Sequence, residues 1–477
     1  MLAIDKVLAV KDSIVTFQTS VGNELRASLL RLDRFEVAFE IYGPSTVLRA
    51  SEVLSDFRII VNDRLIYAGR AVVSNLVDAG VALVCQASLD EASWVDVEVV
   101  SAASAPAELA RGFTTFIEEW QKLYRVRAEY KLIVADMQSF FIQLRLWLDQ
   151  VELGIRATPS GDRLKLEQAL TEELSGPVIA AMNVLFEKFE AVAKGLDEEL
   201  EPVHRSYMRQ QLHPWVMSAP FPHRTFNKPL GYAGDYEMVN MMLRKVHEGG
   251  SLFAKLVNAW FLHQAPAQAH RNRVRYLADK LTVETLRAKS AGREARIFNV
   301  ACGPAHEVQK FLAEQTLSSN SRFTLLDFNE ETLQYVRTQL TEISTRNGRG
   351  AKLNFVKRSV QAVLKEGGRT VARPAQEQYD VVYCAGLFDY LSDPICQRLL
   401  NIMYEWLAPG GVLISTNVDP GNPMRKGMEH LLDWHLIYRT GPRMLAMRPR
   451  QAGEDAASVH SDETGVNVFL EVRKPNG

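Results

Sequence analysis

IFNVACGPAHE, residues 297–307, is an apolar run that passes into small residues and then into polar ones. The run IFNV predicts a buried strand, and the polar residues after Pro304 predict the first turn of a helix. Gly303 stands in the turn between them, where small residues let the backbone approach a bound molecule and the free amides of a helix N-terminus face it. The stretch predicts a ligand-binding turn of an α/β domain, with an ordinary strand–helix turn as the alternative.

From about residue 295 onward, apolar runs alternate with helical patterns. This order predicts βαβ units with a parallel sheet. The end of the chain differs, because two runs flank a tight turn at Glu463–Gly465 and strands joined in this way must be antiparallel. The runs are RFTLL (322–326), LNFVK (353–357), YDVVYC (379–384), GVLISTN (411–417), ASVHSD (457–462) and VNVFLEVRK (466–474).

Further candidate binding residues follow the ends of these runs. Asp327 ends the second run about 20 residues beyond the glycine turn, where a carboxylate can accept both hydroxyls of a ribose. An ordinary helix-capping aspartate is the alternative. Ser359 and Val360 follow the third run, and Cys384, Ala385 and Gly386 end and follow the fourth.

NVACGPAHE, LLDFNEE and the LAPGGVL turn (407–413) together resemble the Rossmann-type methyltransferases that use S-adenosylmethionine. The resemblance implies a seven-stranded sheet with a C-terminal antiparallel hairpin, which dinucleotide-binding Rossmann domains lack. Alanines at 301 and 305 replace two glycines of the usual turn, and alanine disfavours positive φ, so binding is expected to be weaker or differently shaped. The cofactor-binding residues implied are Asn299, Ala301, Cys302, Gly303, Ala305, Asp327, Phe328, Ser359, Val360, Cys384, Ala385 and Gly386.

Two other stretches carry candidate catalytic residues. GYAGDYE (231–237) is either a turn that caps the following helix or a lid that brings Tyr232 or Asp235 to the transferred methyl group. NPMRKGMEHLLDWHLIYRT (422–440) has helical spacing, which would make His435 and Arg439 neighbours on one face. That stretch is either a substrate wall or a buried structural network.

KPLGYAGDYE, NVACGPAHE, LLDFNEE, CAGLFDYL and MEHLLDWHLIYRT together resemble bacterial proteins of extracellular factor (3-hydroxypalmitic acid methyl ester) biosynthesis, over roughly residues 205–475. The resemblance implies methyl transfer to the carboxylate of a hydroxy fatty acid or related acyl substrate, in bacterial signalling. Arg439 and His435 would hold the acid, and Tyr232 would close the site. The alternative is a non-catalytic regulatory protein.

Residues 1–103 contain short alternating runs separated by turn residues, which predicts a small antiparallel barrel or sandwich. GRAVVSNLVDAGVALVC (69–85) resembles the PilZ domain, a cyclic di-GMP receptor, with Asn75, Val77 and Gly80 on its (D/N)xSxxG pattern. Val77 replaces the serine, and Arg31 and Arg34 form RxxR rather than RxxxR. The pattern therefore favours a degenerate module that binds protein or nothing over a working receptor.

Between these parts, the helical periodicity of residues 104–290 predicts a linker or lid region. This region could cover the site or provide the interface of a homodimer. Residues 291–477 are expected to form the α/β domain. The net charge of −2 argues against nucleic acid. Four scattered cysteines argue against a disulfide framework and a metal site. The first residues are too charged for a signal peptide, and no apolar run could span a bilayer, so a cytoplasmic protein is expected.

Overall fold

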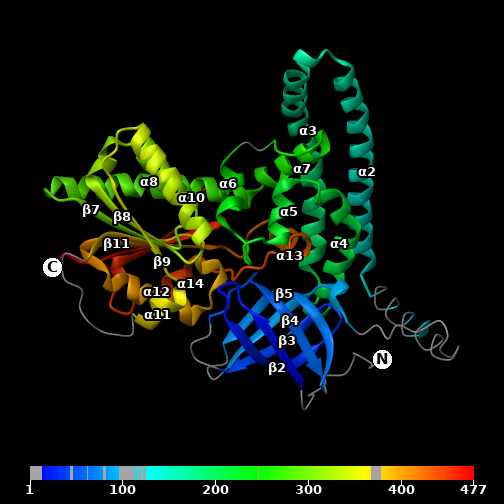
Figure 1. The fold of residues 1–477 in the computed structure, drawn as a ribbon, viewed down its shortest axis with the longest axis horizontal. Helices are drawn as coiled ribbons and strands as arrows, with labels where there is room; N and C mark the ends of the chain where they lie inside the picture. Colours follow the sequence, from blue (N-terminus) through cyan, green and yellow to red (C-terminus); the bar gives the residue numbers. More distant parts are fainter. Residues whose placement is uncertain are drawn as a thin grey trace.

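The computed structural model describes residues 13–476 except 43–46, 62, 79–81, 96–112, 115–116, 118–120, 122–124, 245–246 and 367–377. Three parts meet around one centre: a barrel, a helical bundle and a sheet covered by helices (Figure 1). Gly80 of the PilZ-like pattern and the boundary near residue 103 lie outside the described residues.

The barrel closes through six antiparallel strands in the order β1-β2-β3-β6-β5-β4. Phe17, Phe39 and Phe57 fill its interior, with ring centroids 5.4 to 5.7 Å apart. The predicted barrel is therefore confirmed. The strands are β1 (Ser13–Gln18), β2 (Glu24–Leu32), β3 (Glu36–Tyr42), β4 (Val53–Val61), β5 (Arg64–Asp78) and β6 (Ala82–Leu89).

Helices make up the middle of the chain, as its apolar spacing predicts. Two long helices form a hairpin that projects beyond the rest of the molecule, and shorter helices pack against its base (Figure 1). A single apolar core joins them to residues 424–434 of the last part. The helices are α2 (Ala128–Ala157), α3 (Ser160–Lys194), α4 (Glu201–Val216), α5 (Pro220–Asn227), α6 (Tyr236–Leu243), α7 (Leu252–His263) and α8 (Ala265–Ser290).

The sheet has seven strands in the order β12-β13-β11-β10-β7-β8-β9. The five strands from β11 to β9 pair in parallel, whereas β13 pairs antiparallel with both β11 and β12. The predicted parallel sheet with a C-terminal hairpin is thus confirmed. The strands are β7 (Ala295–Val300), β8 (Ser321–Asp327), β9 (Lys352–Lys357), β10 (Tyr379–Cys384), β11 (Leu407–Val418), β12 (Ala457–Ser461) and β13 (Asn467–Arg473).

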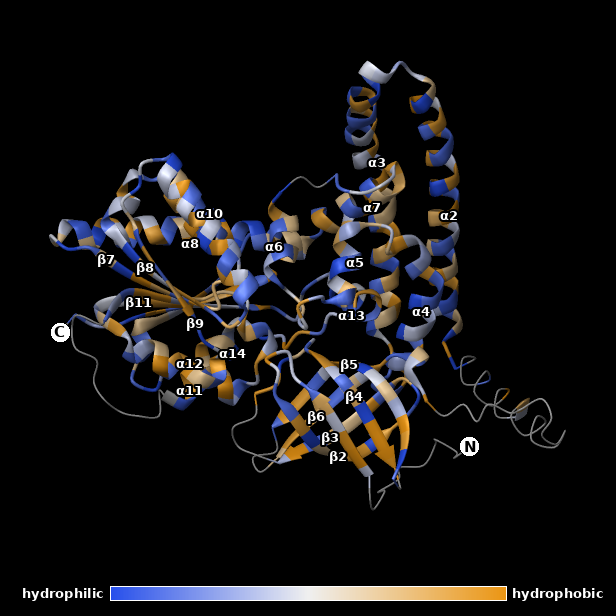
Figure 2. Ribbon diagram, viewed as in Figure 1, coloured by the Kyte–Doolittle hydropathy of each residue, from blue (hydrophilic) through white to orange (hydrophobic). Residues whose placement is uncertain are grey.

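Helices cover both faces of this sheet, so its central strands are buried on both sides and read as continuous apolar runs. α8 and α10 lie on one face, and α11, α12 and α14 lie on the other (Figure 1). Figure 2 shows the central strands in the hydrophobic colour. The helices of this part are α9 (His306–Glu314), α10 (Glu330–Arg346), α11 (Val360–Glu366), α12 (Asp393–Glu405), α13 (Arg425–Leu431) and α14 (Gly441–Ala446).

The helix expected across residues 422–440 is wrong in its second half. α13 ends at Leu431, and the chain then runs without regular structure to Thr440. Asp433 has a left-handed backbone with φ of 51°, which a continuing helix cannot accommodate.

Asp433 joins the three parts of the molecule. Its carboxylate accepts a 2.8 Å hydrogen bond from Arg209 of α4 and bonds of 3.1 Å from Ser88 of the barrel. Burial alone would raise the pKa of Asp433, but Arg209 and His435 hold it well below its usual range. These contacts between distant segments stabilise the strained backbone of Asp433. Within the described residues, no helix is both long and apolar enough to cross a membrane.

Candidate functional site

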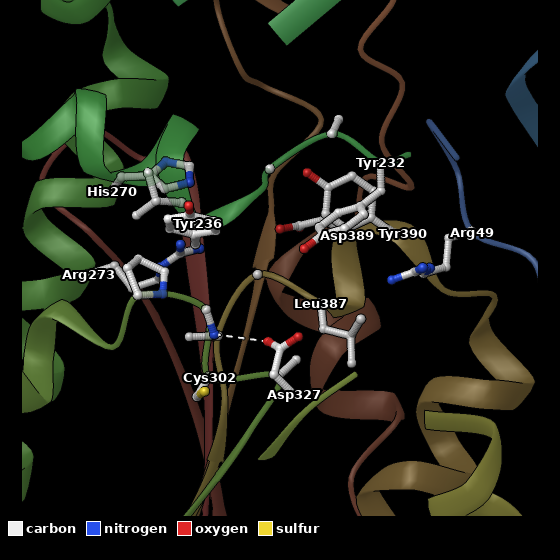
Figure 3. A pocket seen from close by; sticks show the side chains of 18 of the residues that line it. Arg49, Tyr232, Tyr236, His270, Arg273, Cys302, Asp327, Leu387, Asp389 and Tyr390 are labelled. Carbon is white, nitrogen blue, oxygen red and sulfur yellow. Dashed lines mark hydrogen bonds between the residues drawn. The ribbon is translucent and has the colours of Figure 1, made fainter. Parts of the chain in front are cut away.

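A cavity lies at the carboxyl ends of β7, β8 and β10, where ligands of open α/β sheets bind. All three parts of the chain contribute to its wall. Figure 3 shows His270 and Arg273 of α8 on one side and Arg49 of the barrel on the opposite side. The loop before α6 crosses above it with Tyr232 and Gly234 on the wall.

The turn after β7 is unusual because three of its residues have a left-handed backbone. The φ angles of Ala301, Gly303 and Ala305 are 55°, 51° and 49°. The alanines therefore adopt the conformation that glycine would adopt, and the turn keeps its shape with some strain. At Gly303 an added Cβ would meet no heavy atom within 4 Å, so the backbone here faces open space.

Asp327, at the end of β8, is buried and faces this turn. Oδ2 accepts a 3.1 Å hydrogen bond from the amide of Gly303, and Oδ1 accepts one of 3.0 Å from the amide of Asn329. Burial raises the pKa of Asp327, and the two amides lower it. Each oxygen retains a lone pair, so this carboxylate can accept two hydroxyl donors from the cavity.

Behind the turn lies a buried polar cluster. The amide nitrogen of Asn299 donates a 3.0 Å hydrogen bond to Oε1 of Glu307, and the hydroxyl of Tyr383 donates one of 2.7 Å to the same oxygen. Burial raises the pKa of Glu307, although these hydrogen bonds oppose the shift. Asn299 and Glu307 line the cavity and anchor the start of α9 to β7.

The loops after β9 and β10 complete this half of the cavity. Ser359 and Val360 line it, and the hydroxyl of Ser359 accepts a 3.2 Å hydrogen bond from the amide of Ala362 at the start of α11. Gly386 has a φ of 93°, and a Cβ there would lie 3.0 Å from the guanidinium of Arg273. The backbone conformation at 386 therefore favours glycine, and a side chain there would crowd the guanidinium of Arg273.

The far half of the cavity is more apolar, and a second, smaller cavity lies behind it. The two share Pro266, Met428 and Trp434. Among the residues of the smaller cavity only Gln264 is polar. The others are Phe186, Phe221, Met242, Phe261, Pro266, Ala267, Met424, Gly427, Met428, Leu432 and Trp434.

Residues 298–413, which include the glycine turn, Asp327 and Gly386, match the model of a family described as "Methyltransferase domain". The chain carries a methyltransferase domain. S-adenosylmethionine stays the cofactor that the sequence predicts for this domain. The open backbone at Gly303 and the two free acceptor positions of Asp327 fit the adenosyl part of that cofactor.

No curated protein matches the chain. Among solved structures, a possible exported protein from Bordetella parapertussis is 15% identical, with a TM-score of 0.42, and the match covers 63% of this chain and 97% of that one. Magnesium protoporphyrin IX methyltransferase from Synechocystis is 12% identical, with a TM-score of 0.31 and coverage of 43% and 84%. An O-methyltransferase family protein from Burkholderia thailandensis is 12% identical, with a TM-score of 0.31 and coverage of 58% and 71%. At these scores the likenesses add no argument about function.

Most of the predicted cofactor residues lie on the wall of this cavity. Cys384 is the exception because it is fully buried behind the wall, where burial raises the pKa of its thiol. The residues on the wall are Asn299, Ala301, Cys302, Gly303, Ala305, Asp327, Phe328, Ser359, Val360, Ala385 and Gly386.

Tyr232 and Asp235 take different positions from each other. Tyr232 packs on Phe328, with ring centroids 5.2 Å apart, so it lies at the Asp327 end of the cavity. Asp235 caps α6 by accepting a 2.8 Å hydrogen bond from the amide of Met238, and it pairs with Arg224 at 2.9 Å. The structure thus gives Asp235 the helix-capping role that was the simpler of the two hypotheses.

His435 and Arg439 do not reach the cavity, so the roles suggested for them need correction. Arg439 is fully buried, and its guanidinium donates to Asp393 at 2.8 Å, to Asn417 at 2.7 Å and to two backbone carbonyls. His435 bonds to Asp433 at 3.0 Å. Both side chains belong to a structural network, because the chain leaves the helix before reaching them.

Arg273 is one of the wall residues that were not predicted from the sequence. It is 8% exposed and lies on the cavity wall, and no other described residue forms a hydrogen bond or ion pair with its guanidinium. Burial lowers the pKa of Arg273, while the charges of Asp389 and Glu307 raise it. A buried guanidinium with free donors can bind a carboxylate in two-pronged geometry.

No group of three or more His, Cys, Asp or Glu side chains in the described part of the chain could hold a metal ion. Its four cysteines are all buried and free.

Proposed function

We propose that this protein transfers a methyl group from S-adenosylmethionine to the carboxylate of an amphipathic acyl substrate, such as a hydroxy fatty acid. The unpartnered Arg273 guanidinium in the cavity carries the proposal. The charges of Asp389 and Glu307 act on this guanidinium, but its donors have no hydrogen-bond acceptor among the described residues, so an anionic ligand is the expected partner. The resemblance to fatty-acid methyl ester synthesis proteins supports the same substrate class.

The second cavity supports an acyl tail. Its apolar side chains adjoin the methyltransferase cavity through Met428 and Trp434, so an acid held near Arg273 could extend an alkyl chain between them. Burial of each methylene group contributes about 0.8 kcal/mol, which makes chain length a strong determinant of affinity.

For the cofactor, we propose that Asp327 accepts the ribose hydroxyls and that Ser359 and Val360 border the adenine. The turn at 301–305 and the residues Ala385 and Gly386 would surround the methionine part. When bound, S-adenosylmethionine supplies a methyl group on a positively charged sulfur.

The residues of the chain then need to position and shield the acceptor rather than to transfer protons. A carboxylate is already ionised at neutral pH, so it can attack without a base. One of its oxygens forms the new C–O bond as the S–C bond breaks, and the negative charge of the acid and the positive charge of the sulfonium both disappear. Arg273 would hold the acid in line, and Trp434 and the loop over the cavity would exclude water.

The experiment supplies labelled methyl donor and 3-hydroxy fatty acids of graded length to the full chain. Methyl esters in the organic extract are expected. Ala267→Leu, which narrows the second cavity, should shift the preferred acid toward shorter chains. Ala278→Leu is the matched control, since Ala278 is buried on the same helix but lines neither cavity. Label that appears only in protein or in small polar acceptors would refute the proposal.

Arg273→Met tests whether Arg273 binds a carboxylate. It also shows whether that carboxylate belongs to the acceptor acid or to the cofactor. If Arg273 holds the acceptor, KM for the acid rises at least tenfold, while the Kd of S-adenosylhomocysteine is unchanged. If Arg273 holds the carboxylate of the cofactor, the Kd rises instead. In that case the acid would lack its proposed anchor, and the proposal would have to be abandoned in this form.

A further inference from the structure

The loop that precedes β4 brings residues of the barrel to the wall of the cavity. The amide of Ala50 donates a 3.0 Å hydrogen bond to the carbonyl of Tyr390, and the amide of Val53 donates one of 2.8 Å to the carbonyl of Gly231. Tyr390 follows β10, and Gly231 belongs to the loop over the cavity. The barrel loop is therefore attached to two segments that shape the site.

A third attachment passes through Ser51. Its hydroxyl accepts a 2.5 Å hydrogen bond from the amide of His435 and donates one of 2.9 Å to the carbonyl of the same residue. Ser51 is fully buried and has a φ of 57°. A strained backbone of this kind persists only where the surroundings impose it, so the attachment is specific rather than incidental.

Arg49 brings the barrel into direct contact with the cofactor end of the cavity. Its guanidinium lies 4.5 Å from the ring centroid of Phe328 and 5.1 Å from that of Tyr232. Phe328 follows Asp327 directly, and the charge of Arg49 lowers the pKa of Asp327. Figure 3 shows Arg49 opposite His270 and Arg273, across the cavity.

The barrel holds Arg49 firmly in this position. Nη2 donates a 2.6 Å hydrogen bond to the hydroxyl of Ser20, and Nε lies 3.7 Å from a carboxylate oxygen of Glu52. Glu52 is 1% exposed and accepts a further 2.9 Å hydrogen bond from the amide of Ser20. An arginine that is pre-positioned in this way loses little conformational entropy when a ligand packs against it.

We propose that the N-terminal barrel completes the cofactor site, with the Arg49 guanidinium covering the adenosyl part of S-adenosylmethionine beside Asp327. Planar stacking of a guanidinium on an aromatic system suits an adenine as well as a phenyl ring. Cofactor affinity then depends on the docking of the barrel, and any partner that displaces the barrel would release the cofactor. This contact rests on the cofactor placement proposed above and does not depend on the identity of the acceptor.

Calorimetry on the full chain with S-adenosylhomocysteine tests the proposal. Arg49→Ala should raise the Kd at least tenfold, and the same loss should appear with 5′-methylthioadenosine, which lacks the amino-acid part. Arg49→Lys, which keeps the charge but not the planar group, should give a smaller loss. Arg70→Ala is the matched control, because Arg70 also joins the barrel to the helices but does not line this cavity. Its Kd should change less than twofold.

Hydrogen exchange provides a second test, because a ligand that contacts the barrel loop must also stabilise that loop. If the barrel loop contacts the cofactor, S-adenosylhomocysteine must slow amide exchange in residues 47–53 of the wild-type protein, and Arg49→Ala must reduce this protection. A wild-type Kd in folded Arg49→Ala, or an equal loss in Arg70→Ala, would overturn the proposal. Exchange in residues 47–53 that does not respond to S-adenosylhomocysteine would overturn it as well.

Discussion

The amide of Gly303 donates a 3.1 Å hydrogen bond to Oδ2 of Asp327, which ties the turn after β7 to the carboxylate that ends β8. The second oxygen of Asp327 is held by the amide of Asn329 at 3.0 Å. The carboxylate is thus oriented before a ligand arrives, and its remaining lone pairs face the cavity. Such pre-organisation lowers the entropy lost on binding.

Asp327→Ala should weaken the binding of S-adenosylhomocysteine by ~1–3 kcal/mol, because charge-assisted hydrogen bonds to the ribose are lost. Asp327→Asn keeps an acceptor for one of the two backbone amides but sets its NH2 group against the other and removes the charge, so its affinity should fall as well. Calorimetry on both variants gives the comparison. An unchanged affinity in folded Asp327→Ala would mean that the ribose lies elsewhere.

Ala301→Gly and Ala305→Gly should each raise the free energy of unfolding by up to about 1 kcal/mol, because alanine is strained in the left-handed region and glycine is not. Ala313→Gly provides a control of opposite sign. Ala313 is exposed on α9, where glycine should lower stability by about 1 kcal/mol. Urea unfolding measures all three. A loss of stability in both turn variants would show that their backbone is not strained.

The strands and the glycine turn could be predicted because their signals are local. Apolar runs, turn residues and the position of Asp327 all lie within short stretches. The position of Arg49 has no such signal, because it depends on how a barrel loop docks on Gly231, Tyr390 and His435, which lie far along the chain. Arg439 was misplaced because helical spacing continues through Asp433, whereas contacts with Arg209 and Ser88 bend the chain there.

Arg273 left a signal that the sequence analysis did not use. Arg271, Arg273 and Arg275 lie close together on α8. They differ in the side of the helix from which each side chain projects, and this decides what each one contacts. Ala269, Arg273 and Leu277 share the face that lines the cavity, at a spacing of four. Arg271 instead donates to the carbonyl of Met242, and Arg275 pairs with Glu463.

Cyclic di-GMP should bind the barrel weakly or not at all. Arg31 lies 3.7 Å from Asp33 and 3.9 Å from Glu36, so acidic neighbours already compete for its guanidinium. Val77 stands where the PilZ pattern has serine. Calorimetry should give no submicromolar Kd. Tight binding that collapses in Arg31→Ala or Arg34→Ala would show that the barrel is a working receptor.

Arg439→Met should lower the free energy of unfolding by several kcal/mol, roughly 1–3 kcal/mol for each buried acceptor that loses its donor. It leaves the Asn417 oxygen and two backbone carbonyls without their donor. Arg273→Met removes no protein partner, so its stability should fall little or rise. Urea unfolding compares the two variants. If Arg439→Met kept full stability and lost only activity, Arg439 would have a direct role in the reaction after all.

Asp389→Asn should become more stable relative to wild type as the pH rises, because the wild-type carboxyl group loses a proton that the folded state holds. Burial raises the pKa of Asp389 from its ordinary value of 3.8 to about 6. A raised pKa means that the folded state binds the proton more tightly than the unfolded state does. The wild-type protein therefore has this contribution in full below pH ~4 and loses it as the pH rises through about 6.

Asparagine stays neutral and can still accept the 2.6 Å hydrogen bond from the Val418 amide. The stability of Asp389→Asn relative to wild type should therefore rise by up to about 3 kcal/mol between pH 4 and pH 8. Asp393→Asn is the matched control. Burial alone would raise the pKa of Asp393, but its hydrogen bonds to Arg443 and Arg439 hold it below the ordinary value. Its contribution to stability is therefore complete above about pH 4, and this variant should be less stable than wild type by a nearly constant amount from pH 4 to pH 8. Urea unfolding at several pH values measures both differences, and a flat profile for Asp389→Asn would show that Asp389 is ionised at an ordinary pKa.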